Sequence, residues 1–70
     1  DRPRNVSMYL FDLMGRKIRT ILEDREFQAG IFQEKWFGKD DRGIQVSNGI
    51  YMVQLISDKN KLNRKITLLK

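Results

Sequence analysis

The chain has 70 residues, enough for one domain whose core is small relative to its surface. It contains no cysteine and no histidine, which excludes disulfides, the usual transition-metal ligands and catalysis through either side chain. Its 14 Lys and Arg outnumber 9 Asp and Glu, for a net charge of +5. Because the basic residues are spread along the chain among acidic ones, they are typical of a mixed-charge protein surface.

No cofactor and no enzymatic activity are expected, because no set of residues forms a catalytic constellation. No apolar run approaches the roughly 20 residues of a membrane-spanning helix, so no transmembrane segment is predicted. The chain starts at Asp1 and shows no signal peptide, so we expect a C-terminal piece of a longer, processed protein.

The first part of the chain predicts a hairpin. A polar linker over residues 1–5 precedes residues 6–11, which alternate with the period of two that is typical of a strand. Turn residues at 12–15 favour a hairpin over a competing helix, and residues 17–22 are expected to return as the second strand. Ile18, Ile21 and Leu22 do not alternate strictly, which predicts a bulge near Thr20.

The middle of the chain predicts a charged loop, a turn and a third strand. The loop covers residues 23–26, the turn residues 28–30 and the strand residues 31–37. Phe32 and Trp36 share one face of that strand, and Glu34 between them is expected to lie near an edge or to pair with a basic residue.

Two further strands complete the chain. A loop over residues 38–43 and a short extended piece precede Asn48 and Gly49, a pair that favours a hairpin turn. Residues 50–56 and 62–70 are the expected strands, with Tyr51, Val53, Leu55, Ile66 and Leu68 facing inward. Five strands at intervals of about 8–12 residues predict an all-β fold, a single small antiparallel Ig-like β-sandwich over residues 1–70.

Asp40 and Asp41, with Gly38 and Gly43, are weak candidates for a calcium site built from carboxylate and carbonyl oxygens. Their spacing does not fit a helix–loop–helix calcium loop. We favour a turn in which the aspartates accept hydrogen bonds from nearby backbone N–H groups.

The aromatic residues suggest a core and an interface. Trp36 and Tyr51 fall on inward faces and are predicted core anchors. Phe11 and Phe37 should point outward, which favours an interface with another domain or protomer. An aromatic platform for sugars or single-stranded nucleic acid is the alternative, and it would make the chain a carbohydrate-binding accessory domain.

Nucleic acid is not an expected partner, because no nucleic-acid module accompanies the basic residues, which also protect sheet edges against aggregation. The residues weighed were Arg16, Lys17, Arg19, Lys59, Lys61, Arg64, Lys65 and Lys70.

Residues 10–16 (LFDLMGR) resemble a hairpin of the C-terminal sorting domains of the bacterial type IX secretion system, and of the related Ig-like domain of the flagellar hook-capping protein. The resemblance continues, in order and spacing, through residues 18–21, 29–30, 36–43, 46–51 and 64–70. It covers nearly the whole chain. Each motif alone is common, and their succession is the specific feature.

The resemblance implies an extracellular module, secreted or at the cell surface, that the outer-membrane secretion machinery reads as a signal. The residues that match the family's landmarks are the sorting-signal candidates: Gly15, Arg16, Lys65, Leu68 and Lys70. The preceding domain or a neighbouring protomer is a further expected partner, and a homo-oligomer is the alternative.

The chain departs from the family in two ways. Phe37 stands where Asp usually follows the Trp, and the family's first strands are absent before Asp1. The second departure predicts an open sheet edge beside residues 6–11 and a sheet that needs a strand from elsewhere. The alternative function is therefore a protomer of an extracellular filament or surface layer, assembled by strand addition.

Overall fold

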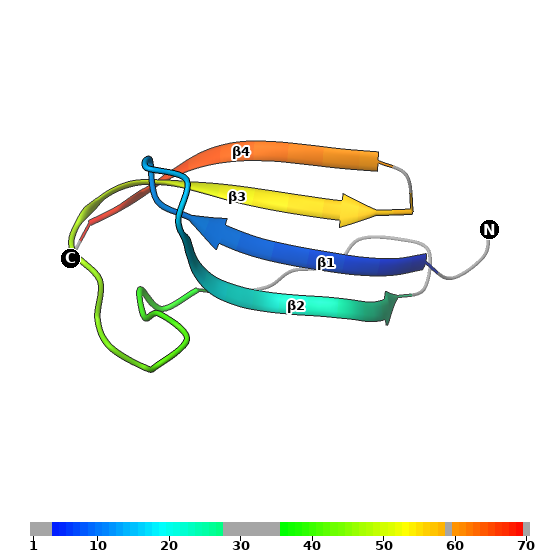
Figure 1. Ribbon diagram of the computed structural model, residues 1–70, viewed down its shortest axis with the longest axis horizontal. Helices are drawn as coiled ribbons and strands as arrows, with labels where there is room; N and C mark the ends of the chain where they lie inside the picture. The colour runs from blue at the N-terminus through cyan, green and yellow to red at the C-terminus, as the bar shows by residue number, and fades with distance from the viewer. Residues whose placement is uncertain (1–3, 28–35, 59, 70) are drawn as a thin grey trace.

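The structure is a computed structural model that describes residues 4–27, 36–58 and 60–69. Its strands are β1 (Arg4–Phe11), β2 (Lys17–Phe27), β3 (Gly49–Ser57) and β4 (Asn60–Leu68). They form one antiparallel sheet in the order β2-β1-β3-β4 (Figure 1). The all-β prediction is confirmed, and this single sheet corresponds to part of a small β-sandwich. No helix in the described residues could cross a membrane.

The predicted hairpin of β1 and β2 is confirmed, but the open edge predicted beside residues 6–11 is wrong. β1 is an inner strand that pairs with β2 on one side and with β3 on the other. The order of strands depends on pairings between distant segments, which alternation along one strand does not specify. The edges of the described sheet are β2 and β4.

β1 and β2 are both longer than predicted. Arg4 and Asn5, expected in a linker, pair with Phe27 and Glu26. The charged loop predicted over residues 23–26 is therefore wrong, because this segment belongs to β2. The residues of this segment are exposed, so their charges remain in water while the backbone pairs with β1.

The bulge predicted near Thr20 is confirmed. Met8 pairs with Leu22 while the next residue, Tyr9, pairs with Thr20, so Ile21 is an extra residue in β2. A second irregularity lies opposite Ser7, where Asp24 has a φ of 50°. The Asp24 N–H donates to Ser7 Oγ at 2.9 Å, so a β1 side chain satisfies the backbone there.

β3 and β4 form the second hairpin. Their register runs without a shift from Ser57–Asn60 at the turn to Gly49–Leu68 at the far end. Asn48 and Gly49, in contrast, do not join a hairpin, since β3 pairs only with β1 and β4 among the described strands. Gly49 instead opens β3.

The third predicted strand falls mostly outside the described residues, as do the turn at 28–30, Phe32 and Glu34. Of that strand, Trp36 and Phe37 are described, and neither lies in a strand. The strand prediction is wrong at these two positions, because both already belong to the loop of residues 36–48.

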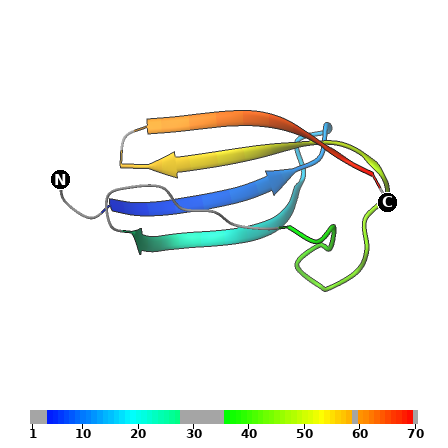
Figure 2. The same cartoon turned by 180° about the vertical axis from the view of Figure 1, so that it is seen from behind.

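The core lies on one face of the sheet. Its buried side chains are Val6, Leu10, Leu22 and Tyr51, and Leu10 alone among the described residues is fully buried. Val53, Ile66 and Leu68 on the same face are half-buried. Figures 1 and 2 show the β1–β2 turn, the loop of residues 36–48 and the last residues of β4 gathered at one end of the sheet.

Candidate recognition surface

The turn between β1 and β2 is held by the carboxylate of Asp12. Oδ1 of Asp12 accepts hydrogen bonds from the N–H groups of Met14 and Arg16, both at 2.9 Å. Oδ2 accepts a third from the Arg16 Nε, also at 2.9 Å. Gly15 has a φ of 86°, which few other residues adopt, and its N–H donates to the Asp12 carbonyl at 3.1 Å. The spacing Asp-X-X-Gly-Arg therefore has a local structural cause.

The loop of residues 36–48 contains the same turn. Oδ1 of Asp40 accepts hydrogen bonds from the N–H groups of Arg42 and Ile44, both at 2.9 Å. Gly43 has a φ of 82° and donates to the Asp40 carbonyl at 2.9 Å. In both turns the Asp N–H also donates to the carbonyl four positions later. This repeat was not predicted from the sequence, although the Asp-X-X-Gly spacing occurs twice, at residues 12–15 and 40–43.

The turns lower the pKa of both carboxyl groups below the ordinary value of 3.8. The largest cause for Asp12 is the backbone N–H of Arg16, and for Asp40 it is the backbone N–H of Ile44. Desolvation is the second-largest effect on both groups and raises the pKa, while the charges of Arg16 and Arg42 lower it by smaller amounts. Asp40 thus accepts backbone hydrogen bonds, the arrangement that the sequence favours over calcium binding. Among the described residues, no cluster of three metal-ligating side chains occurs.

Asp41 joins this loop to the outer edge of β2. Its N–H donates to the Ile18 carbonyl at 3.1 Å, and its Oδ1 accepts from the Thr20 N–H at 3.0 Å. Arg19 Nη1 donates to the Asp40 carbonyl at 2.8 Å. The loop therefore satisfies outward-facing backbone groups of β2, and it occupies the space that an added strand would need there.

Trp36 and Tyr51 meet where the loop packs on the sheet. Their ring centroids are 5.3 Å apart at 72°, an edge-to-face contact. Tyr51 is buried and donates its hydroxyl to the Ser47 carbonyl at 2.6 Å, whereas Trp36 is half-buried and donates its Nε1 to the Lys39 carbonyl at 2.8 Å. The tyrosine contact resembles the tyrosine corner of Ig sandwiches, where a hydroxyl bonds to backbone a few residues upstream.

Three of the sorting-signal candidates lie at the same end of the sheet. Leu68 pairs with Gly49, and Gly49 shares the wall of one open hollow with Met14 and Arg16. Gly15, between them in the chain, is exposed at the tip of the turn. Lys65 lies further along β4, opposite Met52, and Lys70 is outside the described residues.

The two Asp-X-X-Gly turns both lie at this end of the sheet. They face a shared open hollow of about 430 Å³, lined by Asp12, Arg16, Lys17, Ile18, Asp40, Asp41 and Arg42. The side chains of Arg16 and Arg42 are 77% and 80% exposed while each is paired with an aspartate of its own turn. This end of the molecule therefore presents positioned guanidinium groups to solvent.

The two interface candidates, Phe11 and Phe37, differ in their exposure to solvent. Phe37 is 72% exposed and lies beside Arg19, Trp36 and Lys39. Phe11 is half-buried in an inner strand, opposite Met52 of β3. Phe37 thus offers more apolar surface to a partner than Phe11 does.

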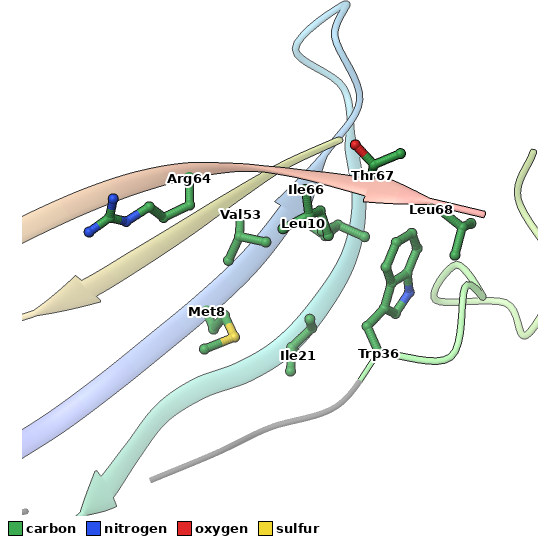
Figure 3. A pocket seen from close by; sticks show the side chains of 9 residues that line it. All are labelled: Met8, Leu10, Ile21, Trp36, Val53, Arg64, Ile66, Thr67 and Leu68. Carbon is green, nitrogen blue, oxygen red and sulfur yellow. The ribbon is translucent and has the colours of Figure 1, made fainter. Parts of the chain in front are cut away.

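A groove of about 420 Å³ opens on the core face of the sheet (Figure 3). Its described lining is Met8, Leu10, Ile21, Trp36, Val53, Arg64, Ile66, Thr67 and Leu68. Trp36 stands near Leu68 at one end, and Arg64 lies toward the other (Figure 3). Arg64 is the one charged side chain among the described lining residues, which therefore contain no acid–base pair and are suited to apolar contact.

The chain matches no family model, no curated protein and no solved structure. The resemblance to sorting domains therefore rests on the ordered sequence motifs alone.

Proposed function

We propose that the chain is a non-catalytic C-terminal module of a secreted bacterial protein, which directs export by the type IX secretion machinery and attachment to the cell surface. The supporting observation is that Gly15 and Arg16 lie at the same end of the sheet as Leu68, which is distant from them in sequence. A receptor could contact them together, because a compact surface buries several residues in one interface.

Arg16 is the residue on this surface best suited to recognition. Its Nε is held by Asp12 at 2.9 Å, yet its side chain remains 77% exposed. A side chain that is already held in position loses less conformational entropy when a partner binds. Arginine is also the side chain that best recognises carboxylates through paired hydrogen bonds.

The repeated turn supplies a matched control for an export assay. Residues 1–70 would be fused to a reporter in a bacterium that has type IX secretion, and the reporter measured in the medium and on the cell surface. We expect Arg16→Ala to reduce export at least about fivefold, which is about 1 kcal/mol of recognition. Arg42→Ala removes an equally exposed arginine from the other turn and should leave export unchanged.

A second arm of the assay removes residues 65–70, which match the family's closing strand. Circular dichroism and Trp36 fluorescence would establish that each variant folds. Export that persists without residues 65–70, or that falls equally with Arg16→Ala and Arg42→Ala, would contradict the proposed role.

A further inference from the structure

The edge of the sheet formed by β4 is a continuous row of backbone groups without a partner strand in the described part of the chain. β4 pairs with β3 over all nine residues, Asn60–Leu68, and no register shift interrupts the pairing. Asn60 to Lys65 are exposed. The other edge, β2, is bulged and is occupied by Asp41 at Ile18 and Thr20. The two edges therefore differ in their capacity to accept a further strand.

The register identifies which backbone groups of β4 point outward. Ser57 and Asn60 close the turn as a pair, so the Asn60 N–H faces β3. Because N–H and C=O directions alternate along an antiparallel strand, Lys61, Asn63, Lys65 and Thr67 direct theirs away from the sheet. These four residues can bond an added strand without disturbing the β3–β4 ladder.

The charge of this edge is of one sign. Lys61, Arg64 and Lys65 lie on β4, and neither β3 nor β4 contains an acidic residue. A second copy that paired its own β4 here would place these cations against one another, which is unfavourable for cross-strand neighbours. The same charges that oppose self-addition would attract an acidic strand.

We propose that β4 is a docking strand for an acidic, extended segment of a partner protein, which adds to the sheet antiparallel to β4. Its acidic residues would lie opposite Lys61, Arg64 and Lys65, with apolar residues opposite Leu62 and Ile66. This inference is independent of the proposed export role, since it rests on the edge alone.

The test uses two synthetic peptides and the whole 70-residue chain. The sequence Thr-Val-Glu-Glu-Thr-Val-Glu places glutamates opposite Lys61, Arg64 and Lys65 in an antiparallel pairing. The control replaces each Glu by Lys. Nuclear magnetic resonance titration should show amide shifts at Lys61, Asn63, Lys65 and Thr67 with the acidic peptide. The control should bind about tenfold more weakly or worse, a difference of about 1.4 kcal/mol. The acidic peptide should also lose affinity as salt increases.

Two variants separate strand addition from simple charge attraction. Replacing Lys61, Arg64 and Lys65 together by Glu should reverse the preference, so that the basic peptide binds better. Asn63→Pro keeps these charges but removes one outward N–H at an edge, where proline is tolerated, and should abolish the amide shifts.

Several results would overturn the proposal. Equal binding of both peptides, shifts centred away from β4, or unchanged binding by folded Asn63→Pro would each do so. Concentration-dependent shifts of the β4 amides in the free protein would identify a second copy as the occupant instead.

Discussion

At the scale of single residues, two aspartates stabilise two turns through the same hydrogen bonds. Asp12 and Asp40 each accept N–H groups two and four positions later, and a glycine of positive φ follows three positions after each. These hydrogen bonds require a short side chain that carries an acceptor oxygen. Asp has such a side chain, which explains why it recurs. Most of the apparent motif is thus accounted for by turn formation. Arg16 differs, because its exposed guanidinium is in addition available for recognition.

Acid should destabilise the fold through these two carboxyls. Their pKa values are lowered in the folded chain, so the stability that they contribute is present above the unfolded value of about 4. It is lost as the pH falls through the lowered folded values. We expect the melting temperature to fall as the pH is lowered from about 5 to 2, measured by circular dichroism.

The double variant Asp12→Asn with Asp40→Asn is the control for that titration. Asn keeps an Oδ1 acceptor for the turn but cannot ionise. Its melting temperature should be lower than wild type at pH 7 and should depend less on pH below 5. A parallel decline in both proteins would mean that other groups govern the acid response.

At the scale of elements, the loop of residues 36–48 acts as a cover for the β2 edge. Asp41→Ala should remove the acceptor of the Thr20 N–H while the Asp41 N–H keeps its bond to Ile18. A lost hydrogen bond of about 1 kcal/mol corresponds to about fivefold faster hydrogen exchange at the Thr20 amide. Amides at the start of β4, at the opposite edge of the sheet from β2, should be unaffected. Asp41→Asn retains an acceptor and should exchange like the wild type.

The sequence predicts those elements whose cause is local. Alternation along residues 6–11 and 50–56 specifies β1 and β3, and irregular spacing around Thr20 specifies the bulge. It fails where the cause is a distant partner. Residues 23–26 look like a solvated loop until Arg4 and Asn5 pair beside them, and Asp41 reaches a backbone 21 residues away. Neither contact leaves a periodic signal.

The candidate site likewise combines features with a local cause and features that depend on distant segments. Asp12, Gly15 and Arg16 form their turn through neighbours in sequence, so their importance is readable from spacing. Their position at the same end of the sheet as Leu68 depends on the order of strands. That order also makes β2 and β4 the edges of the described sheet, and β1 an inner strand.

At the scale of the whole molecule, the sheet has a core too small to be very stable alone. The radius of gyration is 12.8 Å, against about 11 Å for a compact domain of this length. Among the described residues the buried core consists of four side chains, and the groove lies open beside them. A partner that binds the folded chain should therefore make a large relative difference to its stability.

The effect of a bound partner on the stability of the chain can be measured by urea unfolding. A core of this size supplies at most about 3–5 kcal/mol, and with a slope near 1 kcal/mol per molar the midpoint should be at or below about 5 M urea. Trp36 fluorescence reports the transition, because Trp36 packs against buried Tyr51. The acidic peptide at 100 times its Kd should add about 2.7 kcal/mol, whereas the basic peptide should add much less.

The comparison of the two peptides distinguishes a specific stabilisation from a general one. Both have the same length and the same β-forming residues, so a difference between them must arise from the charges that meet Lys61, Arg64 and Lys65. The charge-reversed variant should exchange the two results, because its β4 would carry glutamates at these positions. Equal midpoints with either peptide would show that the folded state gains nothing from an acidic strand. A midpoint well above 5 M without any peptide would show instead that the sheet is stable without a partner.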